Sequence, residues 1–478
     1  MKLYEQISEE LRNRIERGFY SPGSRLPSIR SLSRDYKVSI ATAQEAYHVL
    51  EEQGLVHAKP KSGYFVQCRP TPTQMPSVTR PVQRPVEVSQ WSQVMDLIGT
   101  SGQTDMIRLG YGAPDFSGPT LKPLQRALNG SLSSSNLMRS FDYESLRGSV
   151  ALRTQIARRC IDSGCQLHPD DVVITTSCQE ALSISIRAIV QPGDVVAVDS
   201  PSFYGSMQAI KAFGLKAMEI PTDPVTGISL DALEMALEQW PIRLLQVTPT
   251  CNNPLGYTMP QSHRQRLIKL AQRYDLAIIE DDIYGDLSYE YPRPHTLKAY
   301  DTDGRVLLCS SFSKTIAPGI RVGWVAPGRY REQVQHMKYV SSGPCAPFAQ
   351  DSIAEFMAQG YYDQHLRQMR AQYEKNRDWI ITQVERDFPA GTRISYPQGG
   401  FLLWIELPGD LDSLELEHQL RGRKISIAPG ILFSASGKYR HCIRLNYARI
   451  PGPEAEAAIT LIGQEATRLL LNLDNGAL

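Results

Sequence analysis

A proline-rich stretch near the N-terminus divides this sequence into two parts that are expected to fold separately. Five prolines lie between residues 70 and 85, and almost no periodic apolar pattern accompanies them. Proline-rich chain favours the extended polyproline form, at roughly 3.1 Å per residue, so about 20 residues can span about 60 Å. A chain of 478 residues is also too long for one ordinary core. The sequence therefore predicts an N-terminal domain over 1–70, a linker over 71–88 and a large domain over 89–478.

Composition excludes several classes of protein. The chain is 42% hydrophobic and 21% charged, as in ordinary globular proteins. Its charged N-terminus and the lack of a long apolar run argue against a signal peptide or a membrane span. The eight cysteines form no CxxC pair or Cys/His cluster, so no metal site is expected. We expect a cytoplasmic protein with free thiols and no membrane partner.

Three helical patterns and one hairpin pattern follow one another within the first 70 residues. The first helix is indicated by apolar residues at helical spacing, namely Tyr4, Ile7, Leu11 and Ile15. Ser28 and Ser39 are expected to cap a second and a third helix. Two short apolar runs on either side of a turn at residues 59–63 predict a β-hairpin. This order of elements predicts a winged helix-turn-helix.

The residue types on these elements suit DNA. Small polar residues near the start of the third helix let its backbone approach base edges in the major groove, and these are Ser39, Thr42 and Gln44. Basic residues placed to bind phosphates are Arg25, Arg30, Lys59 and Lys61. Gly63 would let the wing tip approach a groove. Taken singly, these signals also fit a structural helix pair with solvated charges. The net charge of +3 over residues 1–70 is compatible with DNA but does not decide the matter.

The text PGSRLPSIRSLSRDYKVSIATAQEAYHVLEEQG, followed by SGYFV, resembles the winged helix-turn-helix of the GntR family. The resemblance implies binding to a double-stranded DNA operator. Many family members carry a basic residue at the position of Ile40. Base recognition by this helix is therefore expected to rest on few contacts.

Strands and helices alternate through the large domain, which predicts an α/β fold with a mostly parallel sheet. Strands are expected over 171–175, 195–198, 244–247, 277–279 and 306–309, with helices over 179–190 and 263–274. From about residue 348 the pattern is helical and then mixed. We expect a smaller C-terminal α+β lobe there.

Seven motifs of this domain carry a second resemblance. The anchor is Ser-Ser-Phe-Ser-Lys at 310–314, followed by Arg321. With the other motifs in family order, residues 108–449 resemble the fold-type I pyridoxal-phosphate enzymes of the aspartate aminotransferase superfamily. The resemblance implies a Schiff base between pyridoxal 5′-phosphate and Lys314. It also implies phosphate contacts from Ser311, Ser313 and Arg321.

The same resemblance assigns groups to the cofactor ring. Asp281, in the motif Glu-Asp-Asp-Ile-Tyr, would pair with the pyridine nitrogen, while Tyr284 and Asn253 would contact the ring hydroxyl. A carboxylate beside that nitrogen keeps the ring protonated and electron-withdrawing. The adjacent Asp282 stays an alternative to Asp281, although the Asp-x-x-Tyr spacing favours Asp281.

Two further segments are implied in cofactor binding. A helix start is expected to bind phosphate through its backbone, at Ser177, Cys178 and Gln179. Phe203 would stack on the ring face, with Tyr204 as the alternative and core packing as the ordinary role of both.

Two last matches concern the effector and the assembly. Arg444 matches the arginine that binds the substrate α-carboxylate in aminotransferases, and its planar fork suits that group. Tyr143 matches a tyrosine that reaches the cofactor phosphate of the neighbouring subunit. The resemblance thus implies a homodimer.

A winged helix, a linker and this domain together form the architecture of MocR-type regulators, a GntR subfamily. The resemblance favours a transcription regulator in which an amino compound or amino acid reacts at the Lys314 Schiff base and alters DNA binding. One alternative is an active aminotransferase with a fused DNA-binding domain. A third hypothesis is a repressor whose cofactor is structural. The sequence does not identify the effector or the operator.

Overall fold

The computed structural model describes residues 3–16, 19–20, 23–52, 55–59, 62–66, 74–78, 84–88, 91–100, 105–132, 138, 141–450 and 452–476. The chain forms two compact units, Met1–Thr71 and Pro72–Leu478. Lys61, one of the residues expected to bind phosphate, lies outside the described ranges.

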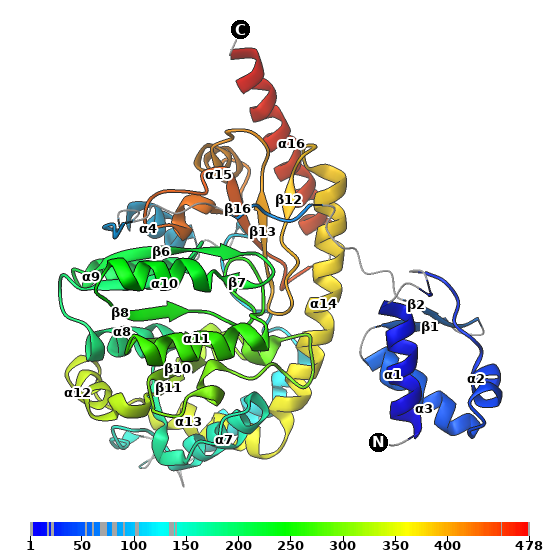
Figure 1. Cartoon of the computed structure of the whole chain (residues 1–478), viewed down its shortest axis with the longest axis horizontal. Coiled ribbons are helices and arrows are strands. Elements are labelled where there is room, and N and C mark those ends of the chain that lie inside the picture. Colours follow the sequence, from blue (N-terminus) through cyan, green and yellow to red (C-terminus); the bar gives the residue numbers. More distant parts are fainter. Residues whose placement is uncertain are drawn as a thin grey trace. The chain divides into compact units, whose positions relative to one another are not determined.

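The described residues of the N-terminal unit form three helices and a two-stranded antiparallel sheet (Figure 1). Its elements are α1 (Leu3–Glu16), α2 (Ile29–Asp35), α3 (Ile40–Glu52), β1 (Val56–Lys59) and β2 (Gly63–Val66). Ser28 Oγ accepts from Ser31 N at 3.1 Å, and Ser39 Oγ accepts from Thr42 N at 3.1 Å. Both serines thus satisfy free N–H groups at a helix start. The core joins all three helices to the hairpin through Ile7, Leu11, Leu32, Tyr47, Leu50 and Val56.

An eight-stranded sheet organises the second unit. Its strand order is β4 (Val173–Thr175), β11 (Gly323–Ala326), β10 (Val306–Ser311), β9 (Ala277–Asp281), β8 (Ile242–Val247), β5 (Val195–Ser200), β6 (Lys216–Asp223) and β7 (Gly227–Ile228). The five strands from β10 to β6 are parallel, and the pairs at both ends are antiparallel. The prediction of an α/β fold is confirmed.

Helices cover both faces of this sheet, which explains why its strands are apolar on both sides. Strand residues such as Ala197, Leu245 and Ile278 pack with α10 (Leu230–Gln239) and α11 (Gln261–Arg273). Their neighbours on the opposite face pack with other helices, namely α8 (Cys178–Ile189), α9 (Tyr204–Ala212) and α12 (Arg331–Ser341). Further helices are α4 (Trp91–Thr100), α5 (Lys122–Ser131), α7 (Val150–Cys160) and α13 (Pro347–Ala358).

A second, smaller sheet has the order β12 (Arg393–Ile394), β13 (Leu402–Glu406), β16 (Cys442–Asn446) and β15 (Ala428–Pro429). The helices of this lobe are α14 (Tyr361–Asp387), α15 (Ser413–Arg421) and α16 (Pro453–Gly476). A short strand, β3 (Ile107–Arg108), comes from far earlier in the chain and pairs in parallel with β14 (Ile425–Ser426). The sequence predicted a small lobe formed by the C-terminal residues alone. That prediction is wrong, because β3 also belongs to this lobe.

The predicted linker also differs from expectation, because parts of it are bound to the second unit. Ile394 N donates to Gln74 O at 2.9 Å, and Ser77 binds the Glu406 carboxylate. Val86 pairs with Ala217 on the free edge of β6. Polyproline-like chain has unpaired backbone groups, and here some of them complete sheet edges. The segments 74–78 and 84–88 are not a free spacer.

Among the residues that the structure describes, none of the helices has the length and apolarity that a bilayer crossing requires.

Candidate functional site

Three polar side chains from separate elements converge beside Gly112. A methyl group placed on this glycine would lie 3.6 Å from Lys314 Nζ, 3.8 Å from an Nη of Arg444 and 3.9 Å from the Tyr284 hydroxyl. Lys314 follows β10, Tyr284 follows β9, and Arg444 lies on β16 of the small lobe. The carboxyl ends of adjacent parallel strands meet at one edge of a sheet, which brings the first two together.

The environment of Lys314 makes its amine easier to deprotonate than that of a solvated lysine. Its Nζ donates to the carbonyl oxygen of Gly112. Burial and then the positive charge of Arg444 lower the pKa of Lys314 to about 8, while Asp281 opposes this shift. A neutral amine is the form that attacks a carbonyl carbon, so the site suits a nucleophilic lysine.

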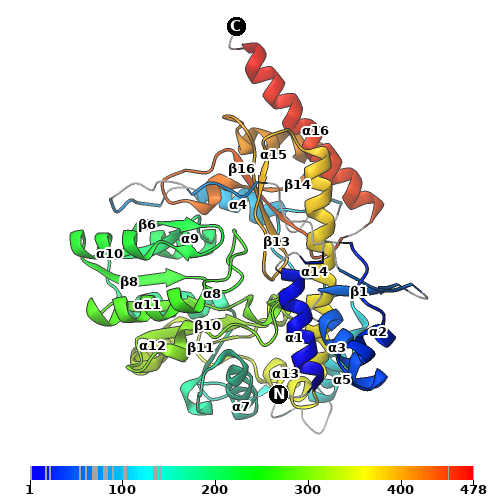
Figure 2. The same cartoon turned by 45° about the vertical axis from the view of Figure 1, so that its right-hand side comes forward.

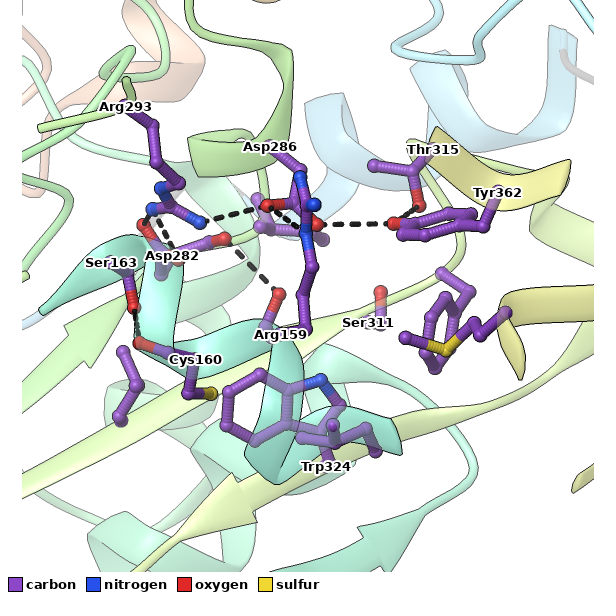
Figure 3. Close-up of a pocket in the computed structure, with 16 residues that line it drawn as sticks. Arg159, Cys160, Ser163, Asp282, Asp286, Arg293, Ser311, Thr315, Trp324 and Tyr362 are labelled. Carbon is purple, nitrogen blue, oxygen red and sulfur yellow. Dashed lines mark hydrogen bonds and ion pairs between the residues drawn. The ribbon is translucent and has the colours of Figure 1, made fainter. Parts of the chain in front are cut away.

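The neighbouring carboxylates Asp281 and Asp282 differ sharply in their partners. Asp282 is bound by Arg293 Nη2, at 2.6 and 2.7 Å from its two oxygens (Figure 3). Asp281 instead accepts from Ile283 N at 3.2 Å and from Cys178 Sγ at 3.4 Å. Burial raises the pKa of Asp281 to about 6. Because Arg293 already occupies Asp282, the geometry favours Asp281 as the carboxylate available to a ligand.

Figure 3 shows the charged network around Asp282. Asp286 contacts Arg293 at 3.0 Å, Arg159 at 3.3 Å and the Tyr362 hydroxyl at 3.2 Å. The same hydroxyl donates to Thr315 Oγ1 at 2.9 Å. The cavity among these residues has about 30 Å³ of space, enough for about two water molecules. This network is thus too confined for a ligand, and it fixes the residue that follows the lysine.

Arg444 is held in place by polar and aromatic partners. One Nη donates to Asn253 Oδ1 at 3.1 Å and the other to Gly110 O at 2.6 Å. Its guanidinium carbon lies 5.0 Å from the centre of the Phe433 ring. Arg444 is 1% exposed, and its Nε has no hydrogen-bond partner. A guanidinium fixed in this way can recognise a planar anion such as a carboxylate.

The residues expected at the phosphate lie around the start of α8. Ser177 caps the helix through Glu180 N, and a methyl group on Gly323 would clash with the backbone of Ser177. Ser311 Oγ accepts from Ser313 N at 3.3 Å, whereas the buried Ser313 Oγ has no partner. Free N–H groups at a helix start attract anions.

The other predicted cofactor residues either bind a backbone carbonyl or are exposed. Gln179 Nε2 donates to Gly205 O at 3.0 Å. Arg321 is exposed, and its side chain donates to Pro318 O at 3.2 Å. Tyr143 is 91% exposed and lies outside the cluster.

Phe203 and Tyr204 are the two alternatives for the residue predicted to stack on the cofactor ring. Phe203 and Tyr204 are both half-buried, with ring centres 4.8 Å apart. Tyr204 lies toward Arg444, at 5.9 Å from its guanidinium carbon. Phe203 lies against Gly205. These contacts do not assign either ring to a ligand.

Sequence reasoning missed the backbone contribution of residues 110–113. The carbonyl oxygens of Gly110 and Gly112 bind Arg444 and Lys314, and Asn446 Nδ2 donates to the carbonyls of Tyr111 and Ala113. Two glycines spaced by one residue in GYGAP are the signal that was available, since glycine permits close backbone approach.

A cavity of about 620 Å³ lies beside this segment. Apolar, aromatic and basic side chains line it, including Met106, Arg108, Leu109, Tyr111, Phe116 and Arg449. Arg449 stacks on Phe116, with 4.5 Å between its guanidinium carbon and the ring centre. The volume lies in the range of pockets for small molecules.

The N-terminal unit presents its predicted DNA-binding residues at the surface. Arg25, Arg30, Ser39, Gln44 and Lys59 are exposed, while Thr42 is half-buried and hydrogen-bonded to Ser39.

The wing gathers three of the predicted residues. Lys59 pairs with Gly63 across the hairpin and lies 4.6 Å from the centre of the Phe65 ring. The backbone of Arg25 forms an antiparallel β-bridge with that of Phe65. The Nε atom of Arg25 would lie 3.4 Å from a methyl group on Gly63. Gly63 has φ = +103°, a conformation that favours glycine. Two cations, Arg25 and Lys59, thus lie close to Gly63 of the wing.

Comparison with known proteins accounts for both units. Residues 3–66 match bacterial regulatory proteins of the gntR family, and residues 104–462 match aminotransferases of class I and II. The uncharacterized HTH-type transcriptional regulator YjiR of Escherichia coli is 47% identical over 470 residues, which cover 98% of this chain and all of the relative. The chain belongs to the MocR-type GntR regulators.

Aminotransferases resemble this regulator only in its second unit. Aromatic-amino-acid aminotransferase 1 of Thermococcus litoralis is 27% identical over 382 residues, covering 78% of this chain and 91% of the relative. The crystal structure of the Pyrococcus horikoshii kynurenine aminotransferase, in complex with PMP, has a TM-score of 0.73 and 27% identity, covering 80% of this chain and 95% of that one. The regulator thus combines a DNA-binding unit with an aminotransferase fold.

Proposed function

We propose that this regulator binds pyridoxal phosphate at Lys314 and changes its affinity for DNA when an amino compound reacts there. The observation that carries the proposal is the convergence of Lys314, Tyr284 and Arg444 beside Gly112, in a chain that also has a winged helix. A nucleophilic lysine and a carboxylate-binding arginine are the two groups that an amino-acid sensor needs.

The residues present fit the cofactor. Ser313 Oγ and Arg444 Nε are buried polar atoms without hydrogen-bond partners, and such groups are costly unless a ligand or water satisfies them. A side chain on Gly112 would fill the space beside Lys314 Nζ. When bound, pyridoxal phosphate supplies an aldehyde that reacts with amines and a ring that withdraws electrons.

Each residue then has a defined task. Asp281 would accept a hydrogen bond from the protonated ring nitrogen of the cofactor. A carboxylate with a pKa of about 6 is mostly ionised at pH 7 and can take this role. Tyr284 and Asn253 are offered to the ring hydroxyl. The lowered pKa of Lys314 increases the neutral share of its amine. Lys314 would therefore hold the cofactor at its aldehyde carbon, with the aldehyde oxygen leaving as water, and its Nζ could take up or release a proton.

The phosphate would lie at the start of α8. The backbone of residues 177–179 and the side chains of Ser311 and Ser313 form this end of the site, and Arg321 would bind there from its exposed position. Tyr143, which is also exposed, would serve a second subunit in a homodimer.

Arg444 orients the incoming compound through its carboxylate. Its fork is held by Asn253 and Gly110, so little side-chain freedom is lost on binding. The cavity beside residues 111–113 would take the rest of the molecule. Its walls are mainly apolar, with Arg108, Arg449 and Glu454 as the charged residues, and this lining favours a bulky side chain.

The test measures DNA affinity and chemistry together. The purified protein, loaded with pyridoxal phosphate, is titrated with a duplex that it selects from random sequence, with each of the twenty amino acids added in turn. We expect at least one amino acid to shift the affinity by about 5- to 150-fold, the usual range of allosteric coupling. An unchanged affinity with every amino acid and with simple amines would contradict the proposal.

A second candidate function is amino-acid transamination by the same site. The similarity to the Thermococcus litoralis aminotransferase and the complete set of charged groups at the site favour it. Turnover of an amino acid and a keto acid, measured on the same preparation, separates the two functions. Fast turnover without any change in DNA affinity would identify an enzyme tethered to DNA.

A further inference from the structure

The first described segments of the second unit, residues 74–78 and 84–88, are bound to both of its lobes. At the first end, Ser77 N donates to Glu406 at 2.8 Å, and Ser77 Oγ lies 2.9 Å from both oxygens of that carboxylate. Gln74 O accepts from Ile394 N at 2.9 Å, so the chain extends the edge of β12. The blue segment beside β12 in Figure 1 is this part of the chain.

The second end is bound to the large sheet. Val86 and Ala217 exchange two backbone hydrogen bonds of 2.9 Å at the edge of β6, and Val88 is buried to 4% exposure. Val86 lies only nine positions after Ser77, which limits the distance between the two attachment points to about 30 Å. Figure 2 shows β6 and the strands of the small lobe as separate layers.

The first attachment lies on the strand pair that carries Arg444. Trp404 is directly opposite Arg444 in the β13–β16 ladder, and Glu406 is opposite Cys442. Glu406 is 14% exposed and also faces Arg393 at 3.5 Å and His441 at 4.0 Å. An anion bound by Arg444 on β16 therefore acts on the strand that pairs with β13, whose Glu406 holds Ser77.

We propose that residues 74–78 and 84–88 form a strap that couples the relative position of the two lobes to the DNA-binding unit, with the Ser77–Glu406 contact as its releasable end. The proposal rests on the proposed function. An amino compound that joins Lys314 in the large lobe to Arg444 in the small lobe changes how the lobes lie. A strap fixed to both must then shift or detach, and the chain that leaves Gln74 leads to the winged helix.

The experiment compares Glu406→Ala with Glu415→Ala, which removes an exposed glutamate of the same lobe whose hydrogen bond is to Gln419 on its own helix. DNA affinity is measured with and without N-(5′-phosphopyridoxyl)-L-leucine, a probe that has both the cofactor part and the α-carboxylate. Hydrogen exchange of the peptide containing residues 74–78 is measured in parallel. Ser77→Ala serves as a milder variant, because it keeps the backbone hydrogen bond to Glu406.

We expect the probe to shift wild-type DNA affinity by about 5- to 150-fold and the affinity of Glu406→Ala by less than about twofold, with Glu415→Ala like the wild type. Ser77→Ala should lie between, and it decides the matter if Glu406→Ala does not fold. Exchange at residues 74–78 should speed up in Glu406→Ala while residues 84–88 stay protected. A wild-type shift of DNA affinity by the probe in Glu406→Ala would overturn the proposal. The same shift in Ser77→Ala, with fast hydrogen exchange at residues 74–78, would also overturn it. A wild type that binds the probe without any change in DNA affinity refutes the proposed function itself.

Discussion

The two units of this regulator present their predicted binding groups in opposite ways. In the winged helix, Arg25, Arg30 and Lys59 are exposed side chains on small elements. In the aminotransferase-like unit, Lys314 and Asp281 shift each other's pKa, and the buried Arg444 lowers the pKa of Lys314. Exposed contacts to phosphates add up independently, whereas buried groups depend on one another. Single substitutions should therefore act gradually in the first unit and abruptly in the second.

The most abrupt effect is expected at Lys314. Lys314→Ala should abolish covalent binding of pyridoxal phosphate, because Lys314 supplies the amine that lies beside Gly112 with Tyr284 and Arg444. Visible absorbance and borohydride reduction followed by mass spectrometry measure this. Lys375→Ala, an exposed lysine on α14, is the control. A pyridoxyl group found on another lysine of the wild type would disprove the assignment.

The pH dependence of cofactor attachment is the next largest effect. Lys314 has a pKa of about 8 against an ordinary value of 10.5, so its neutral fraction at pH 7 is about 300-fold higher than that of a solvated lysine. The rate of attachment should rise with pH and level off above about pH 8. Stopped-flow absorbance between pH 6 and 10, corrected for the titration of the cofactor, gives the midpoint. A midpoint near 10 would mean that the interior does not act on this lysine.

Arg444→Lys should have an intermediate effect. Lysine keeps the charge but loses the fork that Asn253 and Gly110 hold in place. We expect carboxylate-bearing amines to bind roughly 10- to 100-fold more weakly, while amines without a carboxylate are unaffected. Spectral titration measures both classes, and Arg440→Lys, at an exposed pair with Asp412, is the control. Equal losses for both classes would show that Arg444 is structural.

Arg30→Ala should have the smallest effect. Each phosphate contact contributes about 0.9 to the slope of log affinity against log salt. The magnitude of this slope should therefore fall by about 0.9 for each Arg30 side chain that contacts a phosphate. Binding should weaken alike for all sequences. Arg14→Ala on α1, where Arg14 pairs with Glu10, is the control. A loss confined to particular base pairs would show that Arg30 reads a base.

The sequence predicted most of the candidate site because its residues follow strands of one parallel sheet. Lys314 and Tyr284 each come within a few residues of a strand end, so their motifs and the sheet topology suffice to bring them together. The choice between Asp281 and Asp282 needed Arg293, eleven residues further on, whose side chain turns toward Asp282. No periodic pattern marks such a contact.

The contacts of the linker were missed for a related reason. They are made by single backbone groups of Gln74 and Val86 and by one hydroxyl, that of Ser77. Composition described the segment correctly as proline-rich, but composition carries no information on which sheet edge accepts it. The small lobe was likewise placed too late in the chain, because the two-residue strand β3 is too short to show a pattern.

The covered edge of β6 has a consequence for any attempt to cut this protein in two. A chain shortened to begin at residue 89 would lose Val86 and Gln74, and the backbone of Ala217 and Ile394 would face water with unpaired groups. Open strand edges recruit other chains, so the shortened protein is expected to self-associate. A chain beginning at residue 72 retains both covers and should stay dispersed, which light scattering of the two at equal concentration would compare. The segments 74–78 and 84–88 thus also protect two strand edges from pairing with other chains.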